Sequence, residues 1–281
     1  MPLSHLSLNL ITYNLKELEQ LRQLQYATMR PSATYMPIAQ QKWTTNISRT
    51  NFFIENKGQY PVDENTTGSV LYGIHIDNPI WFGKKGVNFL MINREREKFK
   101  KDKEEEEELG KPHSADESLR MVSMTWKNSD PSVVIRPELK QDNYFTMALT
   151  SGTEVKGEKA FAYDRLIYEN LYPFVNVKYE IQNSLSGYHY EIILRPGADA
   201  SKVKFEVSGN FRSLRQHADD EFCIKTKYGS ITENGLKAFY ENGESVPVRY
   251  EIRDKEVSFV FPAGYDQTRT LIIDPWTSSG L

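Results

Sequence analysis

The sequence has a single cysteine, Cys223, among 281 residues. One thiol excludes an internal disulfide framework and any metal site built from several cysteines, so the fold must be stabilised by packing. No apolar run approaches the roughly 20 residues needed to span a bilayer. The first ten residues lack the basic and apolar regions of an export signal. The sequence therefore predicts no membrane span and shows no signal peptide.

The sequence also has little excess of one charge sign over the other. The formal net charge is −3 and the isoelectric point is near 6.0, which disfavours nucleic acid as a partner because its phosphates attract strongly basic surfaces. The phosphate-loop patterns G-x-x-x-x-G-K-[ST] and G-x-G-x-x-G are missing, as are the nucleophile elbow G-x-S-x-G and the zinc motif H-E-x-x-H. We therefore expect no cofactor and no enzyme of these classes.

Most of the sequence, by contrast, has the composition and the alternating pattern of β-strands. Tyr and Phe dominate an aromatic content of 12%, and such side chains fit the half-buried faces of strands better than helices. Apolar residues alternate over 175–181 and 188–194, on either side of a loop with Asn183 and Gly187. Because alternate side chains of a strand share one face, this pattern predicts an antiparallel hairpin. Residues 203–207 continue it as another strand.

Turn signals separate the predicted strands. The Gly-Lys-Lys-Gly segment at 83–86 predicts a hairpin, since glycine accepts positive φ. Residues 195–198, Arg-Pro-Gly-Ala, predict a type II turn. Asn-Gly at 242–243 predicts a two-residue hairpin turn between 236–240 and 246–252. Closely spaced strands without intervening helices favour sandwich-like packing over a parallel α/β sheet.

We therefore expect an all-β fold of antiparallel β-sandwich type, with two packed β subdomains and one N-terminal helix. Leucines recur every three positions over 14–30, behind a capping-box pattern, and predict that helix. A charge-dense stretch at 94–118 breaks the strand pattern, and a solvated loop is favoured there over an acidic cation or partner site. The expected division is 1–50 for the helix and a linker, 51–170 for the first β subdomain with its insertion, 171–276 for the second β-sandwich subdomain, and 277–281 for a tail.

Residues with reactive side chains are few and scattered. The five histidines are widely separated in the sequence: His5, His75, His113, His189 and His217. A metal site would therefore need long-range convergence. His189 stands on the strand face opposite Tyr188 and Tyr190, where an exposed or cross-strand-paired histidine is favoured over a ligand or catalytic group. Cys223 is expected to be a small buried residue and not a nucleophile.

Acidic residues leave two chemistries open. The Asp-Asp-Glu segment at 219–221 could offer oxygen atoms to calcium, but it lacks the D-x-[DN]-x-[DN]-G loop, so a solvated turn is favoured. Glycosidases need only two carboxylates at a suitable separation, and these can come from distant strands. Asp164, Glu169 and Glu191 therefore keep that chemistry open.

Aromatic rings offer one further candidate site. Exposed tryptophans can stack on sugar rings, and four are present: Trp43, Trp81, Trp126 and Trp276. Trp81 and Trp126 are our candidate pair for a glycan platform, although ordinary core or edge packing is favoured for each ring. No catalytic, cofactor-binding or metal-binding residue is predicted.

Several stretches, in this order along the chain, resemble a known but uncharacterised domain. They are Phe53 to Pro61, Asn143 to Phe145, Leu171 to Pro173 with Val175 to Val177, Arg195 to Asp199, and Gly264 to Asp266 with Ile273 to Pro275. The E-N-K-G-Q and P-G-A-D elements are the most specific. The chain is similar, over about residues 50–276, to an N-terminal domain of large exported Bacteroidota proteins. That domain is found ahead of β-propeller-type repeats or gliding-motility-associated C-terminal domains.

This resemblance implies a secreted or cell-surface location, commonly through type IX secretion, and transfers no catalytic residue. Residues 1–50 depart from the resemblance because they lack the usual signal peptide, and the insertion at 94–118 is longer than the pattern. The chain ends just past Ile273-Asp274-Pro275, which suggests a cut at a domain boundary. Downstream domains of the same polypeptide are therefore expected partners.

Strand pattern and resemblance together predict a non-catalytic extracellular structural or adhesion module of a larger protein. A surface glycan or another protein is a further candidate partner. Two alternatives remain open at this point: a carbohydrate-binding module, and a fragment of a carbohydrate-active enzyme.

Overall fold

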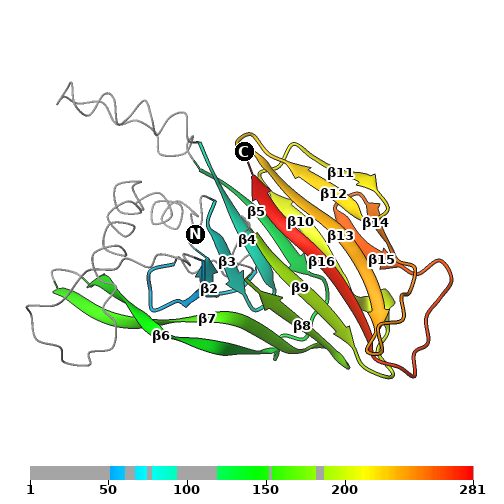
Figure 1. Cartoon of the computed structure of the whole chain (residues 1–281). Helices are drawn as coiled ribbons and strands as arrows, with labels where there is room; N and C mark the ends of the chain where they lie inside the picture. Colours follow the sequence, from blue (N-terminus) through cyan, green and yellow to red (C-terminus); the bar gives the residue numbers. More distant parts are fainter. Residues whose placement is uncertain are drawn as a thin grey trace, which may run out of the picture.

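The computed structural model of the chain describes residues 51–60, 67–74, 78–93, 119–151, 154–181 and 187–280 (Figure 1). In these ranges sixteen strands form one antiparallel sheet. The strands are β1 (Phe53–Glu55), β2 (Val70–Ile74), β3 (Ile80–Gly83), β4 (Gly86–Ile92), β5 (Leu119–Trp126), β6 (Val134–Ser151), β7 (Glu154–Tyr172), β8 (Val175–Glu180), β9 (Gly187–Leu194), β10 (Lys204–Gly209), β11 (Ser213–Ala218), β12 (Glu221–Lys225), β13 (Ser230–Tyr240), β14 (Arg249–Arg253), β15 (Glu256–Val260) and β16 (Leu271–Gly280). A short 3-10 helix, η3 (Ala200–Lys202), precedes β10. The predicted all-β antiparallel class is confirmed.

The strands on either side of β7 form two arms of the sheet. One arm runs from β8 to β11 and the other from β1 to β14 in the order of the sheet. The strand order is β11-β12-β13-β16-β9-β8-β7-β1-β2-β3-β4-β5-β10-β15-β14, with β6 paired to β7. The end strands β11 and β14 contact each other, so the sheet nearly closes into a barrel (Figure 1). The more specific prediction of sandwiches is not confirmed by this single sheet. The helix predicted at 14–30 and the insertion at 94–118 lie outside the described residues.

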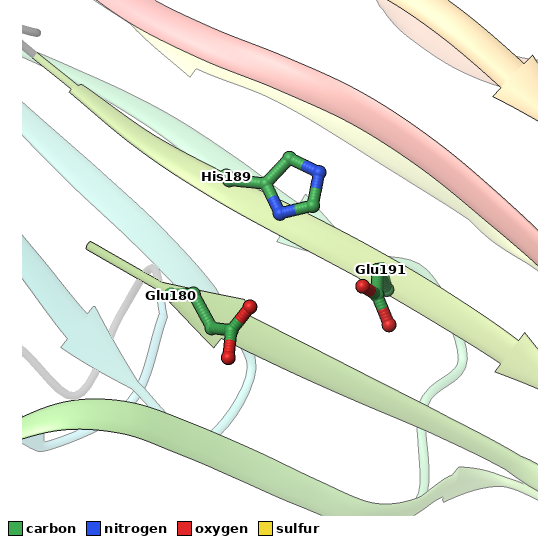
Figure 2. A group of neighbouring side chains, drawn as sticks. All are labelled: Glu180, His189 and Glu191. Carbon is green, nitrogen blue, oxygen red and sulfur yellow. The ribbon is translucent and has the colours of Figure 1, made fainter. Parts of the chain in front are cut away.

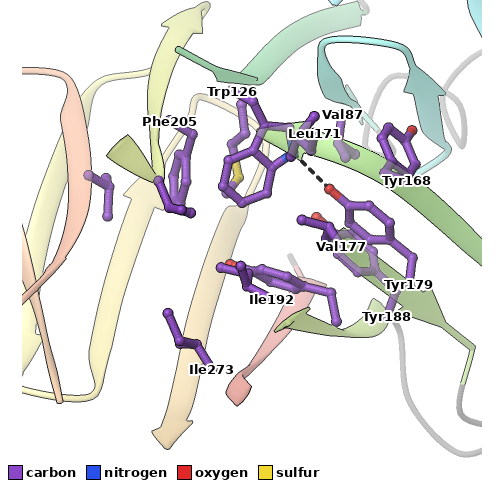
Figure 3. Packing of buried hydrophobic residues seen from close by; sticks show 14 of the residues in the cluster. Val87, Trp126, Tyr168, Leu171, Val177, Tyr179, Tyr188, Ile192, Phe205 and Ile273 are labelled. Atoms are coloured by element: carbon purple, nitrogen blue, oxygen red, sulfur yellow. Dashed lines mark hydrogen bonds between the residues drawn. The ribbon is translucent and has the colours of Figure 1, made fainter. Parts of the chain in front are cut away.

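One large core fills the space between the two arms (Figure 3). Phe82 of β3 packs edge-on against Tyr179 of β8 with ring centroids 5.3 Å apart, and Trp126 of β5 packs against Tyr190 of β9. The core also contains Phe205, which meets Phe222 on the opposite arm. The cluster joins residues from both predicted subdomains, and their division at residue 171 stays a prediction. Within the described ranges, no helix combines the length and the apolar character needed to cross a bilayer.

The strand faces in the C-terminal half agree with the alternation of the sequence. β8 pairs with β9 so that Tyr179 lies opposite Tyr190, and the alternating apolar residues on the inner face of that predicted hairpin are all buried. β3 and β4 form the predicted hairpin, with Gly83 opposite Gly86. The predicted type II turn is also present: Gly197 has φ +88°, and the Ala198 N–H donates to the Arg195 carbonyl at 2.9 Å.

The prediction of a hairpin around Asn242-Gly243 is right for the reversal of the chain, but wrong for the two-residue turn and for the strands. The Tyr240 N–H donates to the Glu244 carbonyl, so three residues form the loop. Gly243 has φ +84°, and the Val246 N–H donates to the Ala238 carbonyl. Beyond this point the two segments separate, and β14 pairs with β15 instead. The physical reason is that β13 already pairs with β12 on one edge and with β16 on the other. The chain therefore crosses to the other arm.

The E-N-K-G-Q element folds into a turn that ties β1 to β2. The Asn56 side chain accepts hydrogen bonds from the Gly58 and Tyr60 N–H groups at 2.9 and 3.1 Å and donates to the Val70 carbonyl at 2.7 Å. Tyr60 then packs against Trp81, with ring centroids 6.0 Å apart. The motif residues are thus used to build the fold.

This turn gives a first prediction. Asn56→Ala removes the acceptor of two backbone N–H groups, so we expect the free energy of unfolding to fall by about 1–3 kcal/mol. Chemical denaturation followed by circular dichroism measures the change. Asn210→Ala, at an exposed position, is the control and should stay within about 0.5 kcal/mol of the parent protein. Equal stability of the two variants would show that the Asn56 turn is not needed to join the strands.

Candidate functional site

The two tryptophans of the predicted glycan platform lie in packed clusters. Trp81 is 8% exposed and Trp126 is 5% exposed. The Trp126 ring lies in the main core, and its Nε1–H donates to the Tyr179 hydroxyl at 3.0 Å (Figure 3). A ring that stacks on a sugar needs an open face, and neither ring has one. Trp276 is half-buried on β16, and Trp43 lies outside the described residues.

The other candidates from the sequence occupy separate places. Cys223 is a buried free thiol in β12, so its predicted burial is confirmed. Residues 219–220 form the predicted exposed turn between β11 and β12, whereas Glu221 is half-buried and begins β12. Glu169 accepts a hydrogen bond from Arg136 at 2.8 Å, and Asp164 accepts one from Gln141 at 2.9 Å. Both carboxylates lie on β7 and are hydrogen-bonded to protein side chains.

Among the described core residues lies one carboxylic acid that the sequence did not single out, Glu233 of β13. It is fully buried, and its carboxyl oxygens accept hydrogen bonds from the hydroxyls of Tyr190, Tyr250 and Thr277. Burial raises the pKa of Glu233 to about 8, although the three hydroxyls favour the carboxylate and lower the pKa. Burial therefore shifts this group toward its neutral acid form, and protein hydroxyls enclose it.

The outer face of β8 and β9 brings together the side chains that the core excludes. Glu180 of β8 lies directly opposite His189 of β9, and Glu191 follows His189 by two positions on the same face. One ligand atom from each of these three residues lies within 4.8 Å of the others (Figure 2). We call Glu180, His189 and Glu191 the His189 cluster. Among the described residues, no other three His, Cys, Asp or Glu side chains bring their ligand atoms this close together.

His189 is held in one orientation by the neighbouring strand β16. Its Nε2 contacts the carboxylate of Asp274, and its ring lies 6.0 Å from the ring of Trp276. A carboxylate accepts hydrogen bonds, so Nε2 carries the proton of the neutral ring and Nδ1 carries a lone pair. Nδ1 is buried and has no hydrogen-bond partner among the described residues. Figure 2 shows this nitrogen on the side of the ring that faces Glu180 and Glu191.

Two cationic side chains border the cluster. The Lys178 ammonium lies 2.8 Å from Glu191 Oε2 and 3.5 Å from Glu180 Oε2. The Arg165 Nε–H donates to Glu180 Oε1 at 2.6 Å, and the same guanidinium reaches Glu138. These cross-strand ion pairs link β6, β7, β8 and β9 and partly neutralise the carboxylates. One imidazole and two carboxylates are groups that can coordinate a cation.

An open groove of about 390 Å³ lies where the E-N-K-G-Q turn meets the start of β6. Glu55 is its acidic residue, and its carboxylate accepts hydrogen bonds from the Phe161 N–H and the Tyr163 hydroxyl. Burial raises the pKa of Glu55, but these bonds and Lys57 outweigh burial and leave the pKa below its ordinary value. The carboxylate in this groove therefore serves the contact between β1 and β7.

Residues 53–276 match a family described as a domain of unknown function, DUF7948. The chain belongs to this family. The DUF7948 match begins with β1 and ends within β16, so it contains the core, Glu233 and the whole His189 cluster. No curated protein and no solved structure matched the chain.

Proposed function

We propose that the chain is a non-catalytic structural or adhesion module of a larger extracellular or cell-surface protein. The observation that carries this proposal is the filled interior. The internal void lined by Trp126, Tyr179 and Tyr190 has a volume of about 10 Å³, which is room for about one water molecule. Sites for small molecules usually need about 300–1,000 Å³. The interior formed by the described residues therefore has no room for a small molecule, and the surface, which includes the groove of about 390 Å³ beside Glu55, is the part of the molecule left to act on a partner.

The cellular setting is part of the same proposal and is supported by the sequence resemblance. The E-N-K-G-Q and P-G-A-D elements resemble those of exported Bacteroidota proteins that carry repeats or gliding-motility-associated domains. Asn56 and Asp199 of these elements form local turns, with Asp199 accepting from the Ser201 N–H at 3.0 Å. Such turns suit a module whose role is a stable shape. The partners in this proposal are downstream domains of the same polypeptide and a surface protein, whereas a surface glycan is the partner expected under the carbohydrate-binding alternative.

Two tests address this proposal. Purified chain is expected to hydrolyse none of a panel of chromogenic glycosides. It is also expected to bind no sugar on a glycan array, because Trp81 and Trp126 are buried. Hydrolysis would overturn the non-catalytic role, and a specific sugar signal would favour the carbohydrate-binding alternative.

In cells that produce the parent protein, deletion of residues 53–276 is expected to reduce adhesion or surface assembly. Protease treatment of intact cells should remove the domain from the undeleted protein. A domain that intact cells protect from protease would contradict the extracellular location.

A further inference from the structure

We propose that Glu180, His189 and Glu191 bind one divalent transition-metal ion on the outer face of the sheet. Their ligand atoms lie within 4.8 Å of one another. Zinc binds nitrogen and oxygen at about 2.0–2.2 Å, which places tetrahedral ligand atoms roughly 3.4 Å apart. Small rotations of three half-buried side chains close that difference. One imidazole with two carboxylates suits Zn²⁺ or Mn²⁺, and this inference does not depend on the proposed function.

The orientation of His189 is a first reason for the proposal. Metal-binding histidines usually donate their second ring N–H to a carboxylate, which fixes the ring and makes the ligand nitrogen more basic. Asp274 occupies that position at Nε2 of His189. The other nitrogen, Nδ1, is buried without a hydrogen-bond partner among the described residues, and such an atom costs free energy. A metal ion between His189 and the two glutamates would satisfy it.

A second reason is that a cation already lies between the two carboxylates. The Lys178 ammonium contacts Glu191 at 2.8 Å and Glu180 at 3.5 Å, so it marks where these carboxylates converge. Lys178 is 18% exposed and has a flexible stem, so its ammonium can move to solvent when a doubly charged ion binds. Arg165 holds the other oxygen of Glu180 and keeps that side chain in place.

Calorimetric titration of the full chain with Zn²⁺ tests the proposal. The parent protein is expected to bind one ion at this site, and Glu191→Gln or His189→Gln to lose that binding. Asp274→Asn should weaken binding by about 10- to 100-fold, as loss of an orienting partner does. Lys178→Met should tighten binding several-fold because it removes the competing ammonium. The visible spectrum of bound Co²⁺ gives an independent signal from the imidazole ligand.

His217→Gln is the matched control. His217 is exposed and lies 3.6 Å from Glu221 in a second histidine–glutamate pair, so its replacement should leave the titration unchanged. Thermal unfolding without metal checks that each variant is folded. Zinc binding of parent strength in folded His189→Gln, or weaker binding in Lys178→Met, would overturn the proposal.

Discussion

Glu233→Gln is expected to make the folded state more stable than the parent protein at pH 8 and above. The ordinary pKa of a glutamic acid is 4.5, and burial raises that of Glu233 to about 8. Between these values the folded chain keeps a proton that the unfolded chain releases, so the parent protein loses stability as pH rises. The slope is roughly 1.4 kcal/mol per pH unit. The loss approaches about 4 kcal/mol across the window, and glutamine removes it.

Denaturant unfolding at several pH values measures this effect. The difference between Glu233→Gln and the parent protein should grow steadily from pH 4.5 to 8 and then level off. Glu241→Gln, in an exposed turn, is the control and should follow the parent curve. Parallel curves for Glu233→Gln and the parent protein would mean that water reaches the Glu233 carboxyl, and the filled interior would then be in doubt.

The sequence predicts the buried faces of the strands well because burial follows alternation. Tyr179, Ile192, Phe205 and Phe259 are all core residues, as period-2 spacing requires. The same spacing places Lys178, Glu180, His189 and Glu191 on the opposite face. Charged residues at alternate positions of both strands are the signal from which the outer ion pairs could have been predicted.

The pairing of distant segments could not be predicted in the same way. Asp274 reaches His189 only because β16 lies beside β9, and no local pattern specifies that neighbour. Glu233 is buried because β13 turns one face to the core, where hydroxyls from β9, β14 and β16 converge on it. The crossing of the chain after Gly243 has the same origin, since both edges of β13 are already paired.

Interior and surface therefore have different roles in this fold. Inside, the one carboxyl group we find among the buried residues is enclosed by three protein hydroxyls. On the outer face, Lys178, Arg165 and Asp274 hold the His189 cluster in an open row of charges. Variants of the cluster should change metal binding with little effect on folding, whereas variants of the core should do the reverse.

Tyr179→Ala is expected to lower the free energy of unfolding by about 3–5 kcal/mol, the usual cost of removing a large aromatic side chain from a core. Tyr179 is 1% exposed, and its ring meets those of Phe82, Tyr168, Tyr188 and Tyr190 at centroid distances of 5.0 to 5.7 Å. Total stabilities of domains are about 5–15 kcal/mol. The substitution therefore removes a large share of what holds the two arms together.

Two further variants separate packing from hydrogen bonding at this position. Tyr179→Phe keeps the ring but leaves the Trp126 N–H without its acceptor, so a loss of about 1–3 kcal/mol is expected. Phe174→Ala removes an aromatic ring that is 56% exposed and should cost far less than Tyr179→Ala. Because Tyr179 contacts strands of both arms, a cost for Tyr179→Ala no greater than that for Phe174→Ala would mean that the arms do not share one core.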